Sequence, residues 1–423
     1  MNKQIIRNEL TGDEYVLIRH DSGLDILIWE MEGYSTTEAL FGTKYGSVNT
    51  RFKVAADSDY TVVPEGIAHF LEHKLFENED CDAFALYAKT GASANAYTSF
   101  DKTCYLFSCS DKYQENLEIL LGFVQNPYFT QETVDKEQGI IAQEIKMCND
   151  NPGNRVFYNM LKCLYHNHPV RIDIAGTVES IAKIDADLLY KCYDTFYNLN
   201  NMVLVVAGNC RADEVIEIAD RKLRHCEDKG LQSDFPEEPE TIVCSEIKEK
   251  MSVGIPIFNI GYKSAPSTGY DALKTELEAF VALSVIADPA SPLYRSMMEE
   301  GLINASFSTE VFSGDGYFTA IFGGESNNPH EVFRRIKAET ERIKAEGMDR
   351  SLYENIKKYT YGSSVRELGN PESVASLMIN SYFSDVSPFD SLKVLSEMTY
   401  DDVMTFIKER LDPDKAALSV VEG

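Results

Sequence analysis

Residues 187–208 read DLLYKCYDTFYNLNNMVLVVAG, which combines a helical stretch, a polar turn and a short apolar strand that ends in glycine. Residues 402–423 read DVMTFIKERLDPDKAALSVVEG and follow the same plan. A second pair of similar stretches, TGASANAY at residues 90–97 and EGLINASF at residues 300–307, lies in the same order along the chain. Self-similarity over so long a period indicates a duplicated domain rather than a short solenoid repeat.

A polar, acidic stretch separates the two copies. Residues 230–250 read GLQSDFPEEPETIVCSEIKEK and contain Pro236 and Pro239, a composition typical of loops. We therefore predict a first domain over residues 1–229, a linker over residues 230–250 and a second domain over residues 251–423. A long surface loop inside a single domain is the alternative interpretation of the same stretch.

The periodicity of apolar residues predicts both helices and strands. Alternating apolar residues predict strands over residues 15–28 and 103–109. Helical periodicity covers residues 114–124, 132–147 and 331–345. Helices do not regularly separate the strands, as the crossovers of a parallel sheet require. We therefore expect an α+β fold, in which each of two homologous domains packs helices on a mainly antiparallel sheet.

The composition excludes several classes of partner. Among 423 residues there are 68 Asp and Glu against 40 Lys and Arg, so the formal net charge is −28, which repels nucleic-acid phosphates and anionic membrane surfaces. Residues 1–10 contain no apolar signal segment, and the longest apolar run, residues 202–207, is too short to cross a bilayer. The nine cysteines are scattered without a CxxC pair. We therefore expect no nucleic-acid partner, no membrane insertion and a location in the reducing cytoplasm.

Two of the seven histidines belong to the segment His69-Phe70-Leu71-Glu72-His73. Positions four apart lie on one face of a helix, so both imidazoles can reach one metal ion. Glu72 lies on nearly the same face and can contact a water on that ion without being a ligand. This HxxEH spacing is the inverzincin signature of zinc enzymes. The alternative is that the two histidines only take part in core packing or form a surface stripe.

A second helical segment offers carboxylates for the same ion, because a catalytic zinc ion needs a third protein ligand and an open fourth position. Residues 137–144 read EQGIIAQE, so Glu137 and Glu144 lie almost two helical turns apart and share a face. One of them can ligate the ion while the other lies beside it. A solvated acidic stripe is the alternative in so acidic a chain.

Three segments together resemble the insulinase or pitrilysin family of zinc peptidases. They are GIAHFLEHKLFE at residues 66–77, GASANAYTSFDKTCY at residues 91–105 and EQGIIAQEI at residues 137–145, and they occur in the family's order and close to its spacing. The similarity extends over essentially the whole chain, including the degenerate second copy. It is closest to bacterial two-domain members that resemble processing peptidases.

The resemblance implies one zinc ion per chain and a role for each residue around it. His69, His73 and Glu144 would be the zinc ligands. Glu72 would be the general base that deprotonates the attacking water. Glu137 would orient the site from just outside the ligands.

The resemblance also implies the reaction and the substrate. The chain would be a zinc endopeptidase that hydrolyses short or unfolded peptides inside a closed chamber. The strand over residues 94–98 would bind the substrate as an added β-strand, through the substrate-binding residues Asn95, Ala96 and Tyr97. If the acidic residues line the chamber, basic peptides would be preferred substrates.

The second copy lacks the metal motif. Ala279, Ala282 and Leu283 take the positions of His69, Glu72 and His73, so the copy keeps an apolar helix, as the inactive domains of the resembled family do. In that family a second pair of domains completes the chamber. We therefore expect this chain to form half of a chamber, in a homodimer or in a heterodimer with a related subunit that lacks the metal motif.

Two other functions remain open at this level. The first is a non-catalytic subunit that binds peptides, but such members of the family generally lose the metal motif that this chain keeps. The second is a zinc hydrolase that acts on substrates other than peptides. The strand-like ANAYT segment at residues 94–98 argues against it, because such a segment suits an extended peptide backbone.

Overall fold

The computed structural model describes residues 2–79 and 82–423, which pack into two compact units. Unit 1 comprises Met1–Ile145, Asp173–Asp234 and Val365–Pro388. Unit 2 comprises Lys146–Ile172, Phe235–Ser364 and Phe389–Gly423. None of the described helices is long and apolar enough to span a membrane.

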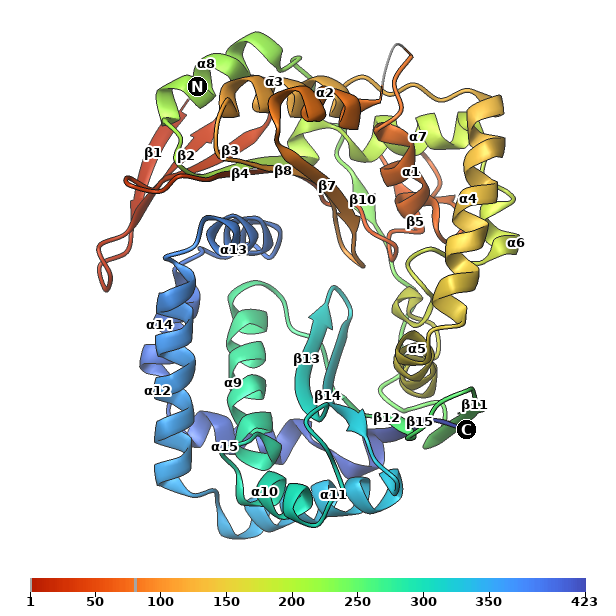
Figure 1. Cartoon of the computed structure of the whole chain (residues 1–423), viewed down its shortest axis with the longest axis vertical. Coiled ribbons are helices and arrows are strands. Elements are labelled where there is room, and N and C mark those ends of the chain that lie inside the picture. The colour runs from red at the N-terminus through yellow and green to blue at the C-terminus, as the bar shows by residue number, and fades with distance from the viewer. Residues whose placement is uncertain (1, 80–81) are drawn as a thin grey trace. The chain divides into compact units, whose positions relative to one another are not determined.

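A seven-stranded sheet forms the centre of unit 1 (Figure 1). Its order is β1-β2-β3-β9-β4-β8-β7; β3 and β9 are parallel, and all other neighbours are antiparallel. The strands are β1 (Asn2–Arg7), β2 (Glu14–Arg19), β3 (Asp25–Glu30), β4 (Thr37–Thr43), β7 (Ser93–Thr98), β8 (Thr103–Cys109) and β9 (Met202–Gly208). A small sheet of order β10-β5-β6 joins β5 (Arg51–Lys53), β6 (Thr61–Val62) and β10 (Gln232–Ser233).

Helices cover both faces of the large sheet in unit 1. Helix α13 packs on β4 and β9 from one side, and α2, α3 and α8 lie on the other (Figure 1). Strands β4 and β9 are therefore buried along their whole length, which explains their nearly continuous apolar sequence. The helices are α1 (Ile67–Leu75), α2 (Ala83–Thr90), α3 (Tyr113–Val124), α4 (Gln131–Asn149), α6 (Val178–Ile181), α7 (Ala186–Phe196), α8 (Ala212–Lys222) and α13 (Pro371–Phe383).

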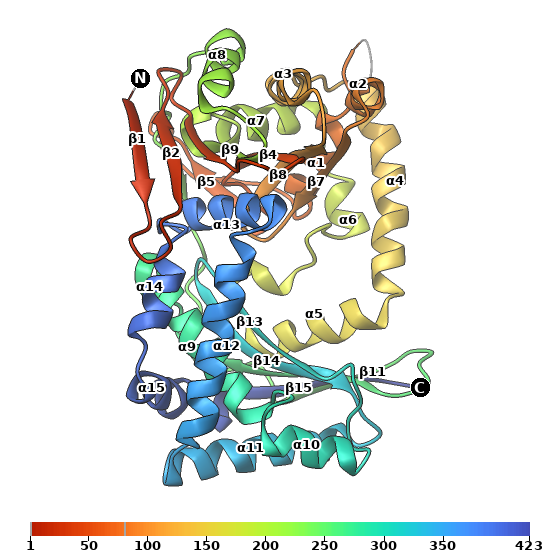
Figure 2. The same cartoon turned by 60° about the vertical axis from the view of Figure 1, so that its left-hand side comes forward.

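Unit 2 is built on a five-stranded sheet of order β11-β15-β12-β14-β13. Helix α5 packs on β12 and β15, as Figure 2 shows. The strands are β11 (Glu246–Lys250), β12 (Ile257–Lys263), β13 (Ser308–Gly314), β14 (Tyr317–Glu325) and β15 (Ala416–Glu422). The helices are α5 (Pro152–Leu164), α9 (Gly269–Ala287), α10 (Pro292–Glu299), α11 (Pro329–Glu346), α12 (Arg350–Glu367), α14 (Asp390–Glu397) and α15 (Tyr400–Arg410).

The sheet topology confirms the duplication predicted from the sequence and the mainly antiparallel α+β class. The order β3-β9-β4-β8-β7 in unit 1 corresponds strand by strand to β11-β15-β12-β14-β13 in unit 2. In both series the first pair is parallel and the remaining pairs are antiparallel. The similar stretches at residues 187–208 and 402–423 form α7 with β9 and α15 with β15.

Two details differ from the pattern expected from the sequence. Residues 15–28 do not form one strand but lie in β2 and β3, which pair as a hairpin around the turn at residues 20–24. The similar stretches at residues 90–97 and 300–307 both begin where a helix ends, α2 in one case and α10 in the other, but the strands that follow do not align. Residues 90–97 already contain most of β7, whereas β13 begins only at Ser308, after residues 300–307. The second copy therefore has a longer connection at this point.

The two units are built from several chain segments each, whereas the domains expected from the sequence are the contiguous ranges 1–229, 230–250 and 251–423. Those ranges describe the two sequence copies and stay a prediction. Unit 1 includes α13 and unit 2 includes α5, because each helix packs on the strands of that unit. The polar stretch at residues 230–250 is ordered by contacts on both sides of the unit boundary. Its β10 pairs with β5 of unit 1, and its Glu238 accepts a hydrogen bond from Lys263 of unit 2.

Candidate metal centre

Helix α1 places both histidines of the HxxEH segment together. It begins after Gly66, whose φ of 89° is left-handed and accessible mainly to glycine. The rings of His69 and His73 lie 4.6 Å apart between centroids, at an interplanar angle of 63°. Phe70 and Leu71, between them, are fully buried in the core of unit 1. The apolar pair thus anchors the helix while the two imidazoles share another face.

Helix α4 brings Glu144 to the same point. Its Oε1 lies 3.6 Å from Nε2 of His69, and its Oε2 lies 3.4 Å from Nε2 of His73. One ligand atom from each of the three residues falls within 4.8 Å of the others, and no further group of this kind occurs among residues 2–79 and 82–423. The three expected ligands therefore converge, although His69 and Glu144 are 75 positions apart in the chain.

The donor set fits a zinc ion. A tetrahedral ion with bonds of about 2.0–2.2 Å holds neighbouring ligand atoms about 3.3–3.6 Å apart, which matches both imidazole–carboxylate distances. The side chain of His69 is only 11% exposed, and its Nδ1 has no hydrogen-bond partner within the described chain. Burial, and then the neighbouring His73, lower the pKa of His69 to about 4, so its ring is neutral at pH 7, as a metal ligand must be.

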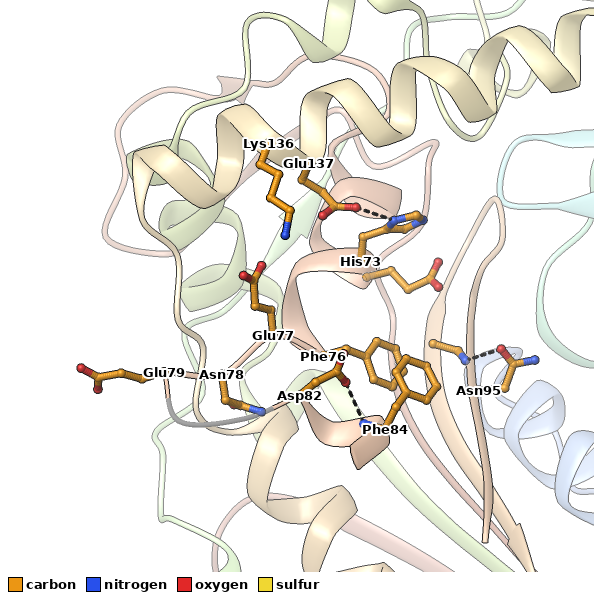
Figure 3. A pocket seen from close by; sticks show the side chains of 12 residues that line it. His73, Phe76, Glu77, Asn78, Glu79, Asp82, Phe84, Asn95, Lys136 and Glu137 are labelled. Atoms are coloured by element: carbon orange, nitrogen blue, oxygen red, sulfur yellow. Dashed lines mark hydrogen bonds and ion pairs between the residues drawn. The ribbon is translucent and has the colours of Figure 1, made fainter. Parts of the chain in front are cut away.

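Glu137 is hydrogen-bonded to the second histidine. Its Oε1 lies 3.0 Å from Nδ1 of His73, and a dashed line joins the two side chains in Figure 3. A proton on Nδ1 leaves the lone pair of Nε2 free on the side of Glu144. Burial is the largest single effect and lowers the pKa of His73, but the hydrogen bond to Glu137 and the charges of the nearby carboxylates together outweigh it, so the pKa is raised overall. The same hydrogen bond is the main reason why the pKa of Glu137 is lowered.

Glu72 lies beside the three ligands without joining them. Its Oε2 accepts a hydrogen bond of 2.8 Å from the hydroxyl of Thr98, the last residue of β7. Burial raises the pKa of Glu72, and the Thr98 hydroxyl lowers it by a smaller amount. Sequence reasoning included Thr98 only as part of the strand over residues 94–98. No local pattern connects that hydroxyl to Glu72, because the two residues are 26 positions apart in the chain.

Strand β7 lies at the edge of its sheet and, within the described chain, pairs only with β8. Asn95 and Ala96 line the cavity beside the metal-binding residues, and the Oδ1 of Asn95 accepts a hydrogen bond of 2.9 Å from the amide of Ala96. Tyr97 is not among the lining residues; it lies beside Cys104 in the neighbouring strand, and burial raises its pKa. The role of these three residues in substrate binding stays a prediction.

The cavity at this site has a volume of about 590 Å³. The rings of Phe76 and Phe84 stack on its wall with centroids 4.4 Å apart (Figure 3). The side chain of Lys74 is fully buried and pairs with the lining residue Glu77, an interaction that sequence reasoning missed. The lining residues are Glu72, His73, Phe76, Glu77, Asn78, Glu79, Asp82, Phe84, Asn95, Ala96, Lys136 and Glu137. Carboxylates therefore dominate the charge of the cavity.

The corresponding helix of unit 2 carries no such site. Ala279, Ala282 and Leu283 lie in α9 and are buried, as predicted for a copy without the metal motif.

Comparisons with known proteins agree with a zinc site formed by His69, His73 and Glu144. Residues 57–178 match the family model "Insulinase (Peptidase family M16)", and residues 183–359 match the model "Peptidase M16 inactive domain". The chain is 39% identical over 409 residues to YmfH, an uncharacterized zinc protease of Bacillus subtilis, and the alignment covers 95% of this chain and 94% of the relative.

Solved structures give the same picture. The crystal structure of an M16-like peptidase from Alicyclobacillus acidocaldarius superposes with a TM-score of 0.92 at 33% identity, over 100% of this chain and 98% of that one. A protease from Helicobacter pylori has the same fold, with a TM-score of 0.82 at 17% identity over 100% of this chain and 99% of that one.

Proposed function

This chain belongs to the insulinase family, peptidase family M16, and from that premise we propose that it is a zinc-dependent endopeptidase of short or unfolded peptides with Glu72 as its general base. One observation carries the proposal. His69, His73 and Glu144 converge on one point, and Glu72 lies next to them on the wall of a cavity. A zinc metallopeptidase needs this combination of three ligands and a free carboxylate.

Each residue of the site has a defined task in peptide hydrolysis. When bound, zinc supplies a Lewis acid for the substrate carbonyl and lowers the pKa of a coordinated water to about 7. Glu72 takes a proton from the attacking water and passes it to the leaving amine. Burial raises the pKa of Glu72, which makes its carboxylate a better proton acceptor near neutral pH. Thr98 holds the Glu72 side chain toward the cavity through its hydrogen bond.

The substrate in this proposal is an extended peptide. Strand β7 has a free edge, so its backbone N–H and C=O groups can pair with a peptide added as a further strand. Asn95 and Ala96 would bring that peptide to the cavity. The net charge of −28 and the carboxylates of the cavity favour basic peptides.

The assembly and location are also proposals. Since unit 2 carries no metal ligands in its described part, we propose that a second subunit completes a closed chamber around the site. That subunit is either a second copy of this chain or a related protein without the metal motif. We propose a cytoplasmic location, where the described cysteines, all free thiols, would remain reduced.

The test is to purify the full chain, measure bound zinc and mass in solution, and assay a library of quenched fluorescent peptides. We expect one zinc ion per chain and cleavage within peptides. Glu72→Gln should keep the zinc and reduce cleavage by about 10²-fold or more, the size of a general-base contribution. Glu132→Gln, on the exposed side of α4, is the matched control.

Full activity of Glu72→Gln would remove Glu72 from the mechanism. A wild-type chain without zinc would overturn the proposal as a whole. Zinc binding without cleavage would instead favour a peptide-binding subunit or a missing partner.

A further inference from the structure

A short segment of unit 1, residues 173–184, contacts the start of α1 and is called the brace below. It contains α6, which is closed at its N-terminus by a capping box between Thr177 and Ser180. The hydroxyl of Ser180 donates a hydrogen bond of 2.8 Å to the carbonyl of Glu65, two residues before α1 begins. The brace therefore holds the chain at the point where it enters the histidine helix.

Two glycines make this contact possible. Gly66 and Gly176 both have left-handed backbones, with φ of 89° and 74°. A Cβ atom on Gly66 would lie 2.4 Å from the carbonyl oxygen of Ala175, and one on Gly176 would lie 2.5 Å from that of Glu65. The segments around Gly66 and Gly176 therefore cross so closely that neither position has room for a side chain. This crossing fixes where α1 starts relative to the brace.

The other side of the brace is attached to α4. The side-chain amide of Gln138 donates hydrogen bonds to two brace carbonyls, 3.3 Å to that of Ile181 and 2.9 Å to that of Ile184. Both isoleucine side chains are buried in the core of unit 1. Gln138 directly follows Glu137, and α6 lies beside α4 in Figures 1 and 2.

From these contacts we propose that the brace sets the separation between the two helices that supply the metal ligands, with Gln138 and Ser180 as positioning residues for zinc. The inference rests on the proposed function. Zinc ligands must meet their bond lengths within about 0.2 Å. His69 and His73 come from α1 and Glu144 comes from α4, so a small shift between these helices changes the imidazole–carboxylate distances directly.

The alternative is that core packing alone holds the two helices and that the brace is merely part of the surface. The two explanations predict different zinc affinities for a variant that is folded but lacks one of the hydrogen bonds of the brace. Loss of a Gln138 or Ser180 hydrogen bond weakens zinc binding only if the brace positions the ligands.

The experiment compares the zinc Kd of the full chain with those of Gln138→Ala and Ser180→Ala, by competition with a chromogenic chelator. Gln143→Ala, on the exposed side of the same helix, is the matched control. Circular dichroism and the melting temperature establish that each variant is folded. The visible spectrum of the Co²⁺-substituted proteins reports the ligand geometry independently of activity.

We expect Gln138→Ala and Ser180→Ala each to raise the zinc Kd roughly 10–100-fold, the usual effect of losing a residue that supports a ligand from outside, and to change the Co²⁺ spectrum. The control should keep the wild-type Kd and spectrum. Gln138 is only half-buried, so its variant still provides the test if Ser180→Ala does not fold.

A folded Gln138→Ala with a Kd within twofold of wild type and an unchanged Co²⁺ spectrum would overturn the inference alone, provided that the wild type binds zinc and cleaves peptides. A wild-type chain that does not bind zinc would overturn the proposed function and the inference with it.

Discussion

Removal of Glu137 should weaken zinc binding by an amount that follows from its hydrogen bond to His73. The two groups lie 3.0 Å apart, and their side chains are only 14% and 25% exposed, so solvent screens the interaction little. A hydrogen bond to a charged group contributes about 1.5–3 kcal/mol. Since about 1.4 kcal/mol corresponds to a factor of ten, Glu137→Ala should raise the zinc Kd about 10–100-fold.

Glu137→Gln separates the charge from the hydrogen bond. The amide oxygen still accepts from Nδ1 of His73, but it carries no charge, so we expect a smaller increase in Kd, less than about tenfold. Glu132→Gln makes the same change of net charge at an exposed position of the same helix and should leave the Kd unchanged.

The assay is chelator competition on apoprotein at pH 7, with the melting temperature of each apoprotein as a check of folding. A Kd of Glu137→Ala within twofold of wild type in a folded protein would refute the reasoning. It would mean that packing around α1, and not Glu137, fixes the orientation of the His73 ring.

Three further predictions concern stability and substrate choice. Burial alone would raise the pKa of Glu238, but hydrogen bonds from Lys263 and from the amides of residues 166–168 lower this pKa to about 2. The ionised carboxylate therefore stabilises the folded state above pH 4.5, the ordinary pKa of a glutamate, and this contribution is lost as the pH falls toward 2. Glu238→Gln should therefore remove about 1–2 kcal/mol at pH 7 and flatten urea-measured stability between pH 4.5 and 2, and an unaltered pH profile would contradict this. Gly66→Ala should destabilise the chain by about 1–3 kcal/mol in urea unfolding, because its Cβ would lie 2.4 Å from a carbonyl oxygen. Gly122→Ala, whose Cβ would meet nothing within 4 Å, is its control, and equal stabilities of the two variants would count against the crossing. Basic quenched peptides should have a higher kcat/KM than acidic ones at low salt, with a difference that shrinks as salt is added. Equal turnover at low salt would reduce the charge of −28 to a feature of solubility.

Local patterns in the sequence were sufficient to predict the individual helices and strands that carry the site. The spacing of His69 and His73 places both on one helical face whatever surrounds the helix, and the structure has them in α1 with their rings 4.6 Å apart. Helices α3, α4 and α11 lie where apolar periodicity predicts them, and strand β8 covers the predicted residues 103–109.

Other features depend on contacts between distant segments and left no local pattern. The hydrogen bond from Thr98 to Glu72 joins an edge strand to a helix 26 positions away in the chain. The sequence did not predict the longer connection between α10 and β13. Residues 300–307 resemble residues 90–97, which contain a helix end and most of a strand, but they form no strand themselves.

The amino-acid sequence by itself therefore determined the duplicated α+β class, the metal-binding residue types and the face of α1 on which the histidines lie, because helical and strand periodicity are properties of neighbouring residues. Only the tertiary structure decided that Glu144 lies 3.4–3.6 Å from both imidazoles and that Glu137 bonds to His73. Those distances depend on how α1 and α4 pack through the core and the brace. Such packing is set by many weak contacts between segments far apart in the chain, and no short stretch of sequence records their sum.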